Sequence, residues 1–173
     1  MYGVKDELLA DMDCFGTARV LARAIEKIGD VDLVICGEGS GDSYQQQTGN
    51  VLGRILGWAT LNGINHLEAS EDRAFVERST ETDIEEYEVF YPAVLSVTSD
   101  INLPRIASFK EIMGAGKKPA TIWSLKDVEA DVERSVVYDA VEAPQQTERK
   151  RLIVEGDDDE AIGQFYNYIK TCI

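Results

Sequence analysis

The chain has 173 residues, enough for one domain with a substantial core, and its hydrophobic fraction of 44% is ordinary for a folded globular protein. Its 17 Lys and Arg residues against 32 Asp and Glu residues give a formal net charge of −15 at pH 7. This balance argues against nucleic-acid binding, which needs clustered basic side chains. No apolar run reaches the roughly 20 residues that span a bilayer. We therefore expect no membrane insertion and a cytoplasmic location, without a signal peptide.

The cysteines and the histidine offer little chemistry. Cys14, Cys36 and Cys172 are far apart and lack the spacing of metal ligands, so free thiols in a reducing compartment are expected. His66 is the only histidine, and its neighbours Asn-Gly-Ile-Asn and Leu indicate a strand. We expect a structural role for it, no metal site and no catalytic residues.

The first third of the chain has the pattern of an α/β unit. Residues 13–28 place apolar side chains at helical spacing, and Gly29 ends that run. Residues 31–36 read VDLVIC, a continuous apolar strand typical of the middle of a parallel sheet. A glycine-rich loop over 37–47 and a helix over 48–58 follow. Strand, glycine loop and helix in this order predict a doubly wound fold.

The remainder predicts an antiparallel segment and then a polar arm. A turn at Thr80–Asp83 separates two of its strands, and Pro92 breaks the pattern after them. A polar stretch over 126–148 without periodicity predicts an extended arm, and Asp157 or Asp158 can cap a last helix. The expected strands are 60–69, 72–78, 84–90, 93–98 and 121–125, and the expected helices are 109–113 and 160–170.

The glycine-rich loop is the sharpest candidate for a ligand site. Three glycines within five residues, Gly37 to Gly41, let the backbone approach a ligand closely. Successive backbone N–H groups in such a curl form an anion-binding concavity, and the following helix points its positive end at the same place. The hydroxyl and amide side chains around it are neutral donors, as a permanently bound nucleotide would need. The candidate residues are Gly39, Ser40, Gly41, Asp42, Ser43, Gln46, Gln47 and Thr48.

Other interpretations of the loop stay open from the residues alone. It matches neither GxGxxG nor a P-loop, and it contains no lysine for phosphoryl transfer. A glycine-rich turn without a ligand is equally compatible with the glycines. Asp42 is expected to cap or brace the loop rather than to act as a base or a metal ligand.

Two stretches together resemble the β subunit of electron-transfer flavoproteins. Residues 32–58 read DLVICGEGSGDSYQQQTGNVLGRILGW, and residues 101–119 read INLPRIASFKEIMGAGKKP. The tail, with TIWSLKDV and QQTERKRLIVEGDDDEAIGQF, is similar to the Fix-type β subunits. The second stretch matches the family signature at Asn102, Pro104, Arg105, Ser108, Ile112, Met113, Ala115, Lys117, Lys118 and Pro119.

The resemblance implies a Rossmann-like fold of the adenine-nucleotide-α-hydrolase type, with a parallel sheet, an inserted antiparallel β segment and a C-terminal extended arm plus helix. It implies an electron carrier without catalytic turnover, paired with an α subunit that holds the redox FAD. Residues 1–125 would form the nucleotide-binding domain, and 126–173 an arm and helix contacting the α subunit. The loop would hold AMP or a second FAD: Thr48-Gly49-Asn50 favours AMP, whereas the Fix-type tail favours FAD.

The resemblance also implies which residues meet other proteins. Dehydrogenases grip family members through an apolar side chain, typically leucine, whose place Phe109 takes here; an ordinary helix core position is the alternative for Phe109. The expected partner-binding residues are Asn102, Pro104, Arg105, Phe109 and Met113.

The family pattern begins with strands that this sequence does not contain, and we expect the chain to start near the third strand, at Val4 to Ala10. Unpaired sheet edges would then favour self-association.

A different class of function is also compatible with the loop. A nucleotide-binding sensor of the universal-stress type would explain the Gly-Ser-Gly sequence but not residues 101–119. An ATP pyrophosphatase-type enzyme is disfavoured, because the loop lacks a basic residue.

Overall fold

The computed structural model describes residues 1–10, 12–41, 43–137, 139–140, 142–145 and 151–171. The chain divides into two compact units, Met1–Val137 and Tyr138–Ile173. The first unit is an α/β body, and the second contains one helix. None of the described helices is long and apolar enough to cross a membrane.

The α/β body is built on a five-stranded sheet of order β2-β6-β3-β4-β5. The first three strands in this order are parallel, and the last three form antiparallel pairs. This arrangement confirms the expected fold class, a Rossmann-like parallel sheet extended by an antiparallel segment. The strands are β2 (Leu33–Gly37), β6 (Ala93–Val97), β3 (Ala59–Ala69), β4 (Arg73–Ser79) and β5 (Ile84–Phe90).

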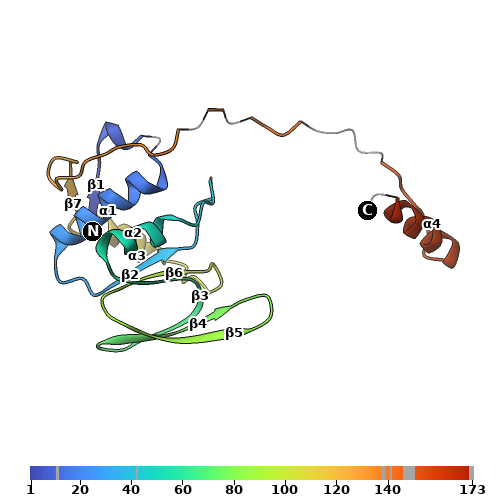
Figure 1. Ribbon diagram of the computed structural model, residues 1–173, viewed down its shortest axis with the longest axis horizontal. Helices are drawn as coiled ribbons and strands as arrows, with labels where there is room; N and C mark the ends of the chain where they lie inside the picture. The colour runs from blue at the N-terminus through green and yellow to red at the C-terminus, as the bar shows by residue number, and fades with distance from the viewer. Residues whose placement is uncertain (11, 42, 138, 141, 146–150, 172–173) are drawn as a thin grey trace. The chain divides into compact units, whose positions relative to one another are not determined.

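Helices α1 (Cys14–Ile28) and α2 (Thr48–Leu56) cover one side of the parallel strands (Figure 1). Adjacent residues of β6, the middle one of the three parallel strands, enter opposite cores: Val94 packs toward the helices, and Leu95 packs against the antiparallel strands. Both side chains are fully buried. The apolar runs of the sequence therefore mark a strand covered on both faces.

One of the two glycines of α2 that face the sheet lets the helix lie unusually close to it. A Cβ atom at Gly53 would come within 1.9 Å of the Thr60 Oγ1 atom on β3. A Cβ atom at Gly49 would make ordinary contact, 3.6 Å from the Cβ of Ser96 on β6. The backbone of α2 at Gly53 is therefore nearer to the sheet than any side chain permits.

A second sheet holds the N-terminal strand. β1 (Tyr2–Val4) pairs in parallel with β7 (Thr121–Trp123). The expected strand from Val4 to Ala10 is wrong, because the extended segment ends at Val4 and a 3-10 helix, η1 (Glu7–Leu9), follows. The cause of this turn is local. The Asp6 carboxylate accepts a 3.2 Å hydrogen bond from the Leu8 N–H, which stabilises a turn in preference to an extended strand.

A buried carboxylate fastens residues far along the chain to the start of α1. Asp13 is 3% exposed, and it caps α1 by accepting a 2.7 Å hydrogen bond from the Gly16 N–H. Its other oxygen accepts from the N–H groups of Ser135 and Val136, at 2.6 and 2.7 Å. The Gly16 hydrogen bond is the main cause that lowers the pKa of Asp13, with the two distant N–H groups and Arg19 adding to it against the effect of burial.

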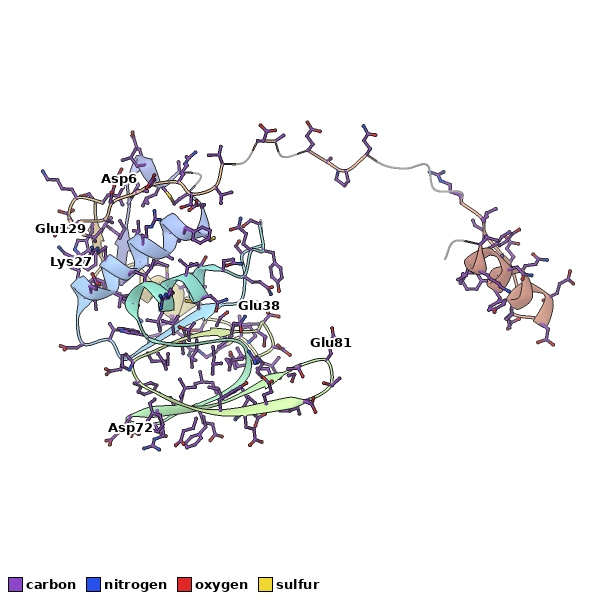
Figure 2. All side chains as sticks on the ribbon, in the orientation of Figure 1. Asp6, Lys27, Glu38, Asp72, Glu81 and Glu129 are labelled. Atoms are coloured by element: carbon purple, nitrogen blue, oxygen red, sulfur yellow. The ribbon has the colours of Figure 1, made fainter. Side chains whose placement is uncertain are left out.

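Further contacts run along the same segment. Lys27 donates to the Asp127 carbonyl at 2.6 Å, and Arg19 donates to the Glu133 carbonyl at 3.2 Å (Figure 2 labels Lys27). Residues 124–137, which follow β7, thus lie along α1 although they have no regular secondary structure.

The second unit contains α4 (Asp159–Lys170). Of the two expected caps, Asp158 is the one that acts, accepting from the Ala161 N–H at 2.8 Å. Among the residues of α4 only Ala161 is buried.

Replacing Asp13 by Asn tests the fastening. The Asn side chain keeps one oxygen that accepts a hydrogen bond, but its NH2 group faces backbone N–H groups that also donate. We therefore expect the free energy of unfolding to fall by about 3 kcal/mol. A depressed pKa contributes stability above the unfolded-state value of about 4, and that contribution is lost as the pH falls through the folded-state pKa. The difference in the free energy of unfolding between wild type and variant, measured by urea unfolding, should therefore become smaller below about pH 4. The exposed Asp30→Asn variant is the control; equal stability of all three proteins would contradict the assignment.

The two glycines of α2 give a matched pair of variants. Gly53→Ala forces Thr60 to move, and we expect it to destabilise the fold by about 1–3 kcal/mol. Gly49→Ala meets no clash and should be neutral or slightly stabilising, because Ala favours a helix over Gly. Thermal unfolding of both variants checks this order, and a Gly53→Ala protein as stable as Gly49→Ala would refute the close approach.

Candidate functional site

The glycine-rich loop leaves the sheet where two parallel strands end. β2 ends at Gly37 and its neighbour β6 at Val97, so the carboxyl ends of both lie at one edge. The Ser96 hydroxyl donates to the Gly37 carbonyl at 3.3 Å and joins the two strand ends. Ligands of open α/β sheets bind outside such an edge.

The loop is curled, but its glycines do not supply the left-handed conformations. The Tyr44 N–H donates to the Ser40 carbonyl at 3.2 Å, which closes a turn. The Ser40 and Ser43 hydroxyls are 3.4 Å apart, and both residues are exposed. Positive φ values occur at Tyr44 (43°) and Gln46 (55°) instead of at a glycine of the loop. Asp42, the carboxylate expected to brace the loop, lies outside the described residues.

An aromatic ring rests on the loop backbone. A Cβ atom at Gly39 would lie 2.7 Å from the Tyr44 ring, so only glycine admits the ring there. Tyr44 is 53% exposed, and its hydrogen bond with the Glu38 side chain is the main cause that raises its pKa (Figure 2 labels Glu38). The sequence analysis did not predict this contact. The signal that could have indicated it is that Tyr44 is the one aromatic residue in a loop of small and polar residues.

The N-terminus of α2 faces the same loop. Gln47 is its N-cap residue and makes no side-chain capping bond, while its carbonyl accepts the Val51 N–H at 2.9 Å. The Asn50 amide donates to the Gln46 carbonyl at 3.4 Å. An uncapped helix N-terminus carries a partial positive charge and suits an anion.

The structure brings most of the predicted loop residues together. A phosphate fits this donor set, because uncapped helix N–H groups and neutral hydroxyls can surround it without a basic side chain. A Cβ atom at Gly41 would meet nothing within 4 Å, so space remains beside the loop. The predicted residues found in this loop or at the first helical position are Gly39, Ser40, Gly41, Ser43, Gln46, Gln47 and Thr48.

The second candidate site follows β6 and displays apolar side chains to solvent. Its helix α3 (Phe109–Ala115) begins with a capping box, in which Ser108 and Glu111 satisfy each other's backbone N–H groups. Glu111 also binds Arg105 at 2.7 Å, and the Ser108 N–H is the main cause that lowers the pKa of Glu111. These bonds hold the segment in shape although none of the residues of α3 is buried.

All five predicted partner-binding residues are exposed in this segment. The helix core position considered for Phe109 is wrong, since its side chain is 79% exposed. Such a group of exposed apolar residues on an ordered element is typical of an interaction surface. The predicted residues are Asn102, Pro104, Arg105, Phe109 and Met113, and Leu103, Ile106 and Ile112 are exposed beside them.

The family model described as electron transfer flavoprotein domain matches residues 1–128. The match contains both the glycine-rich loop and the 102–113 segment.

The Tyr44 contact can be tested by titration. Replacing Glu38 by Gln removes the charged partner, so we expect the pKa of Tyr44 to fall toward its ordinary value. The Tyr44 signal is isolated by subtracting the ultraviolet titration curve of Tyr44→Phe from that of each protein. Glu81→Gln, in the turn between β4 and β5, serves as the control, and an unchanged difference curve in Glu38→Gln would rule the contact out.

Proposed function

The chain belongs to the electron-transfer flavoprotein family, and from this membership we propose that it is a β-type, Fix-like subunit that holds an adenine nucleotide and pairs with an FAD-bearing subunit. The paired FAD supplies the redox chemistry when bound. The residues of this chain hold the nucleotide and present surfaces to the partners.

The observation that carries the nucleotide role is the uncapped N-terminus of α2 beneath a curled loop. The phosphate of AMP would accept hydrogen bonds from the hydroxyls of Ser40 and Ser43 and from the first N–H groups of α2. The Gln47 side-chain amide, which makes no capping bond, would donate a further one. These donors are neutral and the loop holds no lysine, so they favour retention of a phosphate over its transfer. We propose AMP in place of a second FAD, following the Thr48-Gly49-Asn50 sequence.

Partner proteins would use the exposed 102–113 segment. The capping box and the Arg105–Glu111 pair hold the backbone before binding, so little conformational entropy is lost when a partner covers Phe109 and Met113. We propose this segment as the docking site of a dehydrogenase.

The second unit would contact the FAD-bearing subunit. Ile162, Phe165, Tyr166 and Ile169 recur at helical spacing on α4 and are 42–62% exposed. A helix with one such stripe binds by laying it in an apolar groove. We propose residues 126–173 as the arm and helix that make this contact, and residues 1–125 as the nucleotide-binding domain. The first part of this arm, residues 126–137, lies along α1 within the first unit, so we assign the contact itself to the second unit.

The nucleotide role predicts a specific loss of affinity. The chain is mixed with the FAD-bearing subunit, and AMP binding to the purified complex is measured by calorimetry. Gln47→Ala removes a side chain at the helix N-terminus, and we expect it to weaken AMP binding by about tenfold, the loss typical of one hydrogen bond to a charged group. The exposed Gln164→Ala variant in α4 is the matched control.

Three results would count against the proposal in different ways. Complex formation without AMP binding would remove the nucleotide role and leave the carrier role. Equal affinity of the Gln47→Ala and Gln164→Ala complexes would place the nucleotide elsewhere. AMP binding by the chain alone, without any complex, would favour the nucleotide sensor.

A further inference from the structure

The outer side of the antiparallel strands forms one acidic surface. In the register of β3, β4 and β5, Phe75 lies opposite Glu68 and Glu88, and Glu77 lies opposite His66 and Glu86. Paired residues project to the same side of a sheet. We call this surface the acidic sheet face; it lines a hollow of about 400 Å³ and comprises His66, Glu68, Phe75, Glu77, Glu86 and Glu88.

Among the described residues, Glu88 of this face contacts Arg73 and Glu68 contacts His66, whereas Glu77 and Glu86 have no basic partner. Glu77 and Glu86 stand directly opposite each other, an arrangement that destabilises a strand pair. Arg73 is engaged by Glu88 at 2.5 Å and by Asp72 at 2.7 Å. In the part of the chain that the structure describes, no Lys or Arg forms an ion pair with Glu77 or Glu86. The register of β4 and β5 thus places two carboxylates opposite each other, and neither forms an ion pair with a described Lys or Arg.

Apolar side chains accompany the charges. Phe75 and Phe90 are 48% and 56% exposed, and Ile84 at the start of β5 is 68% exposed. Residues 84, 86, 88 and 90 alternate with the inward side of β5, so Phe90 and Ile84 share the side of Glu86. Exposed aromatic residues set among charges are typical of protein interfaces, where the aromatic groups supply most of the affinity.

The negative charge of the acidic sheet face determines which kind of partner can bind it. A second copy of this face would bring the same carboxylates, and the chain as a whole carries −15. The 102–113 segment and the residues after it have the opposite character, with Arg105, Lys110, Lys117 and Lys118 against Glu111. The chain therefore presents two exposed apolar surfaces, one acidic and one basic. The acidic surface suits a basic partner, and the basic surface suits an acidic one.

A carrier that exchanges dehydrogenases while keeping its FAD-bearing subunit needs separate surfaces for the two. We propose that the acidic sheet face binds a surface of the FAD-bearing subunit in which Lys or Arg side chains flank apolar ones. This assignment rests on the proposed function, which gives the 102–113 segment to the dehydrogenase. The basic side chains would lie between Glu77 and Glu86 and relieve their repulsion, and Phe75 would be covered.

A single substitution separates binding from folding. Glu77→Lys creates an opposite-charge pair with Glu86, so the free chain should unfold at a higher urea concentration. The same change places a cation against the basic partner, and we expect the dissociation constant of the complex with the FAD-bearing subunit to rise by about tenfold or more. A variant that binds worse while folding better excludes misfolding as the cause.

The control changes the same charge outside the face. Glu81→Lys lies in the exposed turn that joins β4 to β5 (Figure 2), and it should leave the dissociation constant nearly unchanged. The wild-type constant should rise with added salt more steeply than that of Glu77→Lys, because salt screens the attraction.

The outcomes distinguish the two proposals. A wild-type complex whose affinity Glu77→Lys does not alter, or alters no more than Glu81→Lys, overturns the acidic-face assignment and leaves the carrier function standing. Failure of the wild-type chain to form any complex overturns both.

Discussion

The candidate site depends on the close approach of α2 to the sheet. Gly53 brings the helix backbone against Thr60 on β3, where an added Cβ atom would clash. At Gly49, one turn earlier, there is room for a Cβ atom at ordinary contact distance from Ser96. The helix N-terminus is thereby fixed next to the ends of β2 and β6. A larger residue at position 53 would clash with the Thr60 side chain, so either Thr60 or the helix would have to shift. Packing beneath the helix thus fixes the position of the N-terminus at which we propose that a phosphate binds.

Charge is segregated on the α/β body in spite of the acidic total. The exposed 102–113 segment and the two lysines that follow it, Lys117 and Lys118, bring cations near apolar side chains. The antiparallel strands instead bring carboxylates near Phe75 and Phe90. Surfaces of opposite sign discriminate between partners mainly by repelling the wrong one. A net charge of −15 by itself would indicate only that the protein is soluble. The way in which the charges are distributed over the surface indicates which partners can bind where.

Local patterns were enough to predict most of the fold. Apolar runs, glycine stops and the Thr80–Asp83 turn predicted the helices and strands, and counting outward equally from that turn already pairs Glu77 with Glu86. The N-terminal strand was mispredicted because the Asp6 side chain competes for the backbone. The candidate loop residues were predicted from composition, and their role stays a prediction. The contact of Tyr44 with Gly39 depends on left-handed backbone conformations that the sequence does not reveal.

The loop is held in its curl by contacts of its own. Left-handed conformations at two non-glycine residues, Tyr44 and Gln46, cost about 1 kcal/mol or more each and persist only where the surroundings impose them. Here the Tyr44 ring rests on Gly39, its hydroxyl bonds to Glu38, and Asn50 holds the Gln46 carbonyl. Because these contacts form within the chain, the strain is offset before any ligand arrives. A phosphate would then meet donors already in place, so its hydrogen bonds would contribute to affinity without first ordering the loop.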